Sequence, residues 1–122
     1  MIDVHEQPDS NIVEMTVSGS ITAQEFDDAL AAFKGAIERH GRIRVLENVG
    51  ELETPPIPWN KLWDDVKFSF EHLSDVTHVA VVADQGWIGA YVNMLNPVLK
   101  AELKHFKRPE LEVARAWLAQ AA

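Results

Sequence analysis

Residues 79–99 read VAVVADQGWIGAYVNMLNPVL, and this stretch decides the fold. Its first part, Val79 to Ala83, is apolar at every position, which is typical of a strand inside a sheet with both faces covered. Asp84-Gln85-Gly86 is a turn signal, and no side chain over residues 85–99 is charged, although a quarter of the whole chain is. The pattern predicts a central strand that leads directly into a helix with a surplus of apolar surface.

The predicted helix over residues 85–99 has two apolar stripes about 100° apart around its axis. The first stripe contains Trp87, Tyr91, Met94 and Val98, and the second contains Ile88, Val92, Leu95 and Leu99. A helix predicted over residues 57–73 comes before the central strand, and Phe68 keeps its far face from being purely polar. If the Trp87 stripe covers the sheet, the Ile88 stripe faces Phe68, and the two helices line an apolar groove when they open. The alternative is a helix that is permanently buried between the sheet and its neighbour.

The first half of the chain contains shorter sequence patterns that predict strands and a turn. Ile2–Glu6 is a strand candidate, and the alternation of Val13, Met15 and Val17 with polar residues is typical of a half-buried strand. The turn-forming residues 7–11 between them predict an antiparallel hairpin.

A capping box, Thr22-Ala23-Gln24-Glu25, then opens a helix that Gly41 ends. The next strand contains Ile43, Val45 and Leu46 and is expected to stop at Asn48-Val49-Gly50. A strand over Glu102–Phe106 and a helix that starts at Pro109 follow the long apolar stretch.

These elements follow the order β-β-α-β-α-β-α-β-α. Strands that are separated by helices need crossover connections, which are right-handed in nearly all proteins. We therefore expect one α/β domain over residues 1–122. Its five-stranded mixed sheet has a parallel centre and an antiparallel hairpin at one edge.

Composition excludes several classes of protein. The chain of 122 residues has no cysteine, which excludes disulfides and sulfur-ligated metals. Its formal net charge of −8 argues against nucleic acid as a partner and against tight adhesion to anionic lipid. Residues 1–6 lack the features of a signal peptide, and residues 85–99 are shorter than the roughly 20 residues that span a bilayer. We therefore expect a cytoplasmic protein.

Asp84 is the best single polar candidate for a site. It follows a central strand just before a helix, where open α/β sheets bind ligands. The alternative is that its carboxylate caps the helix by accepting N–H groups near Gly86 and Trp87. The histidines are scattered without metal-ligand spacing, so we expect no metal, no cofactor and no enzyme. An enzyme that uses Asp84 with His78 or His105 is the remote alternative.

Two motifs resemble the SpoIIAA-like family of small bacterial proteins, which is related in fold to STAS and CRAL-TRIO domains. The first is Trp63-Asp64-Asp65-Val66-Lys67-Phe68-Ser69-Phe70, and the second is Thr77-His78-Val79-Ala80-Val81-Val82-Ala83-Asp84 followed by Trp87. Val17-Ser18-Gly19 near the start and Ala116-Trp117-Leu118 near the end support the resemblance. It covers almost the full length and implies a STAS-like domain with the element order given above.

The resemblance implies a switch or binding module and brings no catalytic residues. The anti-sigma antagonists among STAS domains are phosphorylated on a serine after the third strand. Here the corresponding residues 48–56 contain no Asp-Ser pair, and their sole hydroxyl, on Thr54, follows two glutamates that would repel a phosphate. We therefore expect no phosphorylation switch of that type.

We expect a non-enzymatic module that binds an apolar, lipid-like ligand, or transiently a membrane surface. Lipid-binding relatives imply that the helices over 57–73 and 85–99 move, and such a protein would be cytoplasmic or peripheral to the membrane. The groove would be lined by Trp63, Phe68, Trp87, Ile88, Val92 and Leu95. The alternative is a protein-interaction regulator, similar to an anti-sigma antagonist without the phosphoserine, or a homodimer that uses the same surface.

Overall fold

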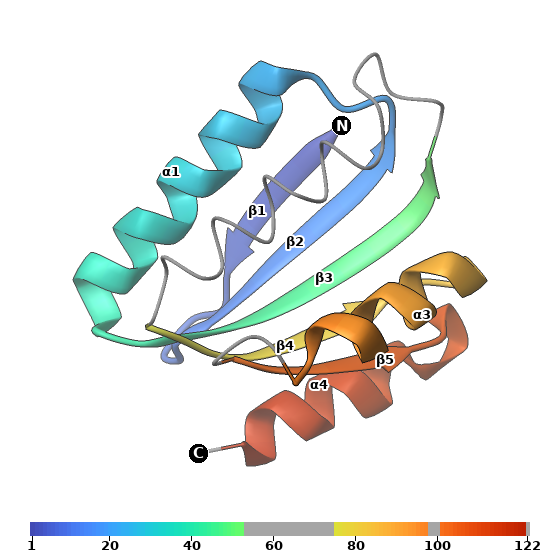
Figure 1. Ribbon diagram of the computed structural model, residues 1–122. Helices are drawn as coiled ribbons and strands as arrows, with labels where there is room; N and C mark the ends of the chain where they lie inside the picture. The colour runs from blue at the N-terminus through green and yellow to red at the C-terminus, as the bar shows by residue number, and fades with distance from the viewer. Residues whose placement is uncertain (53–74, 98–100, 122) are drawn as a thin grey trace.

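A computed structural model describes residues 1–52, 75–97 and 101–121 of the chain (Figure 1). For Leu52, Trp87, Tyr91 and Leu95 it describes the backbone alone. The elements are β1 (Ile2–Glu6), β2 (Ile12–Gly19), α1 (Ala23–His40), β3 (Ile43–Leu52), β4 (Val76–Val82), α3 (Gly86–Leu95), β5 (Glu102–Phe106), η1 (Arg108–Glu110) and α4 (Leu111–Gln120). The helix predicted over residues 57–73 lies outside the described residues.

The five strands form one sheet in the order β1-β2-β3-β4-β5. β1 runs antiparallel to β2, and every other neighbouring pair is parallel. The predicted mixed sheet, with its parallel centre and its antiparallel edge hairpin, is therefore confirmed. β3 occupies the middle, where Glu47 stands in register with Met15 of β2 on one side and with Val81 of β4 on the other.

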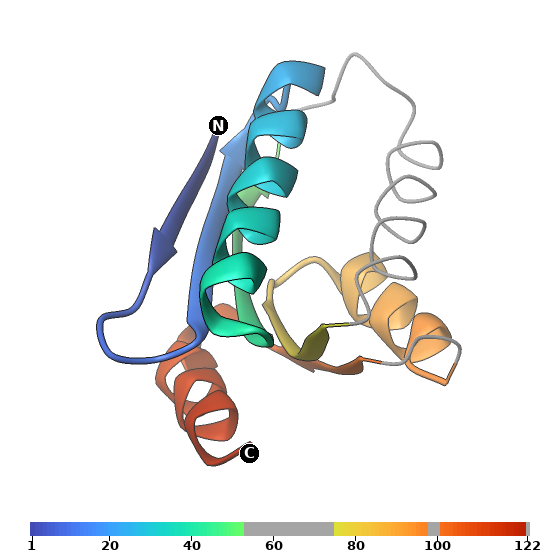
Figure 2. The same ribbon diagram turned by 90° about the vertical axis from the view of Figure 1, so that its left-hand side faces the viewer.

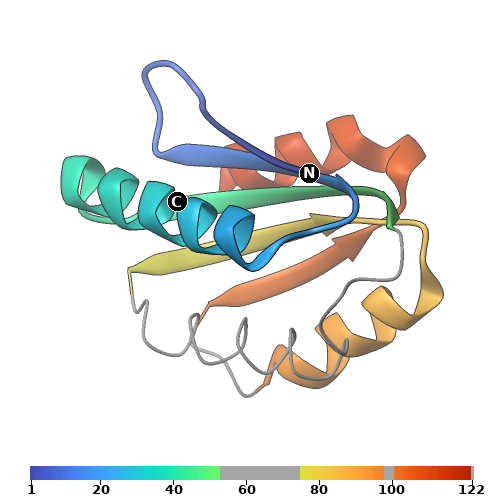
Figure 3. The same ribbon diagram turned by 90° about the horizontal axis from the view of Figure 1, so that it is seen from above.

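Helices cover both faces of the sheet. α1 and α3 lie on one face, and α4 lies on the other (Figures 2 and 3). The core of the first face joins side chains of both helices to the strands, and it includes Phe33, Ala36, Val45, Val79, Val81, Ile88 and Val92. The second core is smaller and includes Ile12, Leu46, Ala80, Phe106, Ala114 and Leu118.

α1 begins and ends as the sequence predicts. The Thr22 hydroxyl accepts a hydrogen bond from the Glu25 amide at 3.1 Å, and the Glu25 carboxylate accepts from the Thr22 amide at 3.3 Å. Gly41 ends the helix with a φ of 81°, a left-handed conformation that glycine adopts without steric cost. The buried line of α1 is centred on Ala29, Phe33 and Ala36, and the two small side chains let the helix approach the sheet closely.

Two boundaries differ from the sequence prediction. β3 runs to Leu52 and does not stop at residues 48–50, because it continues to pair with β2, where Val49 is in register with Val17 and Leu52 with Gly19. α3 ends at Leu95 and does not reach residue 99. Pro97 comes two residues later and has no N–H with which to continue the helix.

A local hydrogen bond shapes the start of α4, and a contact with β3 holds its C-terminal end. Pro109 lies in the 3-10 turn η1, where the Lys107 amide donates to the Glu110 carboxylate at 2.9 Å. At the other end, Arg44 of β3 donates to the carbonyl oxygen of Ala121 at 2.8 Å. A cation in this position also complements the negative end of the helix dipole.

Removal of the α1 cap tests the contribution of this helix to stability. Thr22→Ala leaves the Glu25 amide without its acceptor, so we expect the free energy of unfolding to fall by about 1 kcal/mol. Thr22→Ser keeps the oxygen and serves as the control, and urea denaturation measures both. Equal losses in the two variants, or no loss in Thr22→Ala, would show that the cap does not stabilise the fold.

Candidate functional site

The carboxyl ends of β3, β4 and β5 meet at one edge of the sheet, where the sequence places Asp84. Asp84 is exposed, and its carboxylate accepts a hydrogen bond from the backbone amide of Arg108 at 2.9 Å. It therefore fastens the segment after β4 to the segment after β5. The alternative that it caps α3 is wrong, because Gln85 is the N-cap residue and the Asp84 carboxylate bonds to the Arg108 amide instead.

The structure does not assemble Asp84 and His78 into one site. His78 lies near the start of β4, with its Nε2 3.5 Å from the carboxylate of Glu102 and its ring against Trp117 of α4. Asp84 follows the other end of the same strand. Six residues of strand separate the two by about 20 Å.

His105 holds α3 against β5. Its Nε2 lies 2.7 Å from the carbonyl oxygen of Ala83, and its ring lies under Gly89 of α3. A Cβ at position 89 would come within 2.9 Å of the His105 Nδ1. Glycine is therefore required at this crossing, and His105 is a packing residue.

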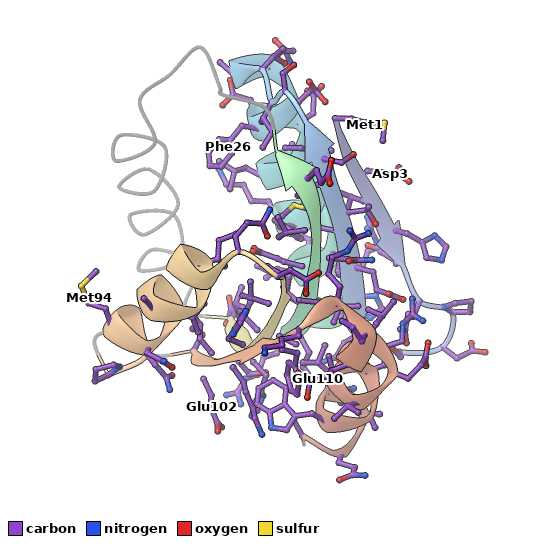
Figure 4. All side chains as sticks on the ribbon, turned by 90° about the vertical axis from the view of Figure 1, so that its right-hand side faces the viewer. Met1, Asp3, Phe26, Met94, Glu102 and Glu110 are labelled. Carbon is purple, nitrogen blue, oxygen red and sulfur yellow. The ribbon has the colours of Figure 1, made fainter. Side chains whose placement is uncertain are left out.

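This crossing decides which side of α3 turns inward. Ile88 and Val92, 0% and 5% exposed, are buried in the same core as Val81 of the sheet. Met94 is 61% exposed, and Figure 4 shows its side chain pointing away from the sheet. The expected orientation is therefore reversed: the stripe with Ile88 covers the sheet, because Gly89 brings this side of the helix onto His105.

The structure does not describe the side chains of the other residues of the predicted groove. Trp63 and Phe68 lie outside the described residues. Trp87 and Leu95 belong to α3, but only their backbone is described. Their part in a groove stays a prediction.

Glu47 is the functional candidate that sequence reasoning missed. It lies in the middle of β3 and is 8% exposed, and it is the one charged residue among the described residues that is buried. Its carboxylate forms no hydrogen bond or ion pair within the described part of the chain. Burial raises the pKa of Glu47 to about 7.

The signal for Glu47 is the alternation along its strand. Residues at every second position of a strand share one face, so Ile43, Val45, Glu47 and Val49 point to the same side. Ile43, Val45 and Val49 all lie in the core that α1 and α3 cover. A prediction that ended the strand near residue 48 left Glu47 at its margin, where a charged side chain needs no explanation.

Gln85 adds a second polar group near the end of β3. Its Nε2 donates to the carbonyl oxygen of Gly50 at 2.8 Å, which links the start of α3 to β3. Its Oε1 is buried and has no hydrogen-bond partner in the ranges that the structure describes. Gly50 is three residues beyond Glu47, about 10 Å along the strand.

Other kinds of site find no support in the described ranges. No three histidine, aspartate or glutamate side chains there gather closely enough to hold a metal ion. No helix in those ranges has the length and hydropathy needed to cross a membrane.

A five-stranded mixed sheet with one antiparallel edge strand and helices on both faces defines a STAS-like α/β domain. The chain belongs to the SpoIIAA-like family, whose model matches residues 12–119. It is similar to a crystal structure at 2.25 Å of an uncharacterised DUF3478-family protein with a SpoIIAA-like fold from Shewanella loihica PV-4. The TM-score is 0.65 at 19% identity, over 97% of this chain and 92% of that chain, which shows the shared fold. No curated protein matches.

The pH dependence of stability tests the burial of Glu47. A carboxyl whose pKa rises from 4.5 in the unfolded chain to about 7 in the folded one binds its proton more tightly when folded. The free energy of unfolding therefore falls as the pH rises through this window, by about 3 kcal/mol in total. Glu47→Gln should abolish this loss, so that the variant gains stability over the wild type between about pH 5 and pH 8.

Urea denaturation at a series of pH values measures this difference. Glu51→Gln, on the same strand but exposed, removes the same charge and serves as the control. Parallel pH profiles for wild type and Glu47→Gln would contradict the burial of an unpaired carboxyl.

Proposed function

We propose that this protein is a non-enzymatic binding module that encloses an apolar, lipid-like ligand between α3 and residues 57–73. The observation that carries the proposal is the apolar surplus of α3. Its inner side, at Ile88 and Val92, is buried in the core, and its outer side still presents Met94 to solvent at 61% exposure. No residue of the helix is charged, so a second apolar surface can cover it without burying an ion.

α3 is fastened to the sheet by few polar contacts. Within the described residues these are the bond from Gln85 to Gly50 and the bond from the Leu103 amide to Asn96 at 3.0 Å, whereas the contact of Gly89 with the His105 ring is van der Waals packing. Lifting the helix would expose Ile88 and Val92, which costs about 3–6 kcal/mol. A ligand recovers about 0.8 kcal/mol for each buried methylene, so a chain of roughly four to eight methylenes offsets that cost.

The separation of the polar candidates supports binding over catalysis. Asp84 is engaged with the Arg108 amide, His78 with Glu102, and His105 with Ala83. STAS-like folds of this kind are typically non-enzymatic. A transient contact with a membrane surface remains part of the proposal, since a ligand of this chemistry would be drawn from lipid.

The exposure of Met94 favours one second candidate function, a protein-interaction regulator or homodimer that uses the outer side of α3. Size-exclusion chromatography with light scattering separates the two. A dimer that persists on dilution, and that Met94→Asp makes monomeric, would favour this candidate.

Uptake of a neutral apolar chain tests the proposed function. We expect 1-decanol to bind the wild type, as followed by tryptophan fluorescence and native mass spectrometry. Phe68→Asp combined with Leu95→Asp places charge in the proposed groove and should weaken binding at least tenfold, because a buried charge opposes apolar burial.

Val113→Asp is the matched control, since Val113 is 57% exposed on α4, on the opposite face of the sheet. It should bind as the wild type does, and circular dichroism checks that all variants fold. Unchanged uptake by the folded double variant, or no uptake by the wild type, would overturn the proposed function.

A further inference from the structure

The carboxyl of Glu47 has no structural task that the described residues explain. It stands in the central strand, where an apolar side chain of similar volume would stabilise the fold more. Buried polar groups in proteins are nearly always paired, and each unpaired one calls for an explanation. Buried titratable groups with strongly shifted pKa values cluster at functional sites, which makes Glu47 a candidate for one.

The described core side chains on the same face of the sheet as Glu47 are apolar. Met15 and Val81 flank it in the sheet, α1 contributes Phe33 and Ala36 to the same face, and α3 contributes Ile88. None of these side chains can donate a hydrogen bond or balance a negative charge.

Two other charged or titratable side chains, His105 and Arg39, are already engaged. His105 is in register with Val81, so it stands two strands from Glu47, about 10 Å away, and its Nε2 meets the Ala83 carbonyl. Arg39 of α1 pairs with Glu6 at the β1 edge. The described part of the chain therefore offers Glu47 no cation.

A ligand that pairs with the Glu47 carboxylate must therefore donate a hydrogen bond. The charge of its head group decides which kind of ligand fits. A ligand with an anionic head would bring a second unpaired negative charge beside Glu47, in a protein whose formal net charge is already −8. A protonated amine would instead form a charge-assisted hydrogen bond with the carboxylate, the stronger kind of hydrogen bond.

We propose that Glu47 anchors the ligand of this protein and that this ligand is an apolar chain with a single amine head. The inference rests on the proposed function, because it takes the same face of the sheet and the same apolar chain. It adds the head group: the ammonium meets the Glu47 carboxylate, and the chain lies against the core side of α3.

The proposal predicts a proton release on binding. The ammonium pairs with the ionised carboxylate, so any Glu47 that is protonated must give its proton to the buffer. Because burial places the pKa of Glu47 at about 7, roughly half a proton leaves per ligand at neutral pH. A carboxylate exposed to water would release almost none.

Isothermal titration calorimetry with decylamine, 1-decanol and decanoic acid tests this. Two buffers with different ionisation enthalpies at pH 7 report the protons released. We expect decylamine to bind the wild type at least tenfold more tightly than the alcohol or the acid, with the release of about half a proton. Glu47→Gln should lower the decylamine affinity to that of 1-decanol and abolish the release.

Glu51→Gln, an exposed position on the same strand, is the control and should keep both properties. Equal binding of amine and alcohol by the wild type, or no proton release, would overturn the inference and leave the proposed function standing. An equal loss of decylamine affinity in Glu47→Gln and Glu51→Gln would also overturn it, because attraction to the net negative charge would then be the cause. If Glu47→Gln does not fold, the proton release by the wild type decides. Binding of none of the three chains would overturn the proposed function itself.

Discussion

The position of β3 between two parallel neighbours is the constraint on which the rest of the structure depends. Because it pairs with β2 and β4 along most of its length, its backbone is saturated and both of its faces are covered. Val45 lies in the core that α1 and α3 cover, and Leu46 lies in the core that α4 covers. Glu47, in the middle of this strand, is therefore held inside the protein, whereas Glu51 near its end is exposed.

A second constraint acts at the crossing of α3 and β5. The absence of a side chain at Gly89 lets the helix rest on His105, and this contact sets the rotation of the whole helix. Ile88 and Val92 then point into the sheet, and Met94 points outward. The helix is uncharged, and few polar contacts of the described residues fasten it, so its attachment depends mainly on apolar burial.

The two constraints give the proposed site its chemistry. The α3 crossing provides an apolar helix, and β3 provides a carboxyl that lacks a partner among the described residues. Asp84 lies at the strand ends where open α/β sheets bind ligands, but its carboxylate already accepts a hydrogen bond from the Arg108 amide. The sequence therefore predicted a site at the strand ends, at Asp84. The burial of Glu47 instead indicates a site in the middle of the sheet face that α1 and α3 cover.

Local signals in the sequence determined most of the fold. The apolar run of β4, the capping box at Thr22 and the two motifs shared with the SpoIIAA-like family were sufficient for the mixed sheet and the family, because each depends on neighbours along the chain. The end of β3, the rotation of α3 and the burial of Glu47 depend on partners far away in sequence, Gly19, His105 and Met15 among them. Only the tertiary structure decided these, since a strand end or a buried face is set by what packs against it.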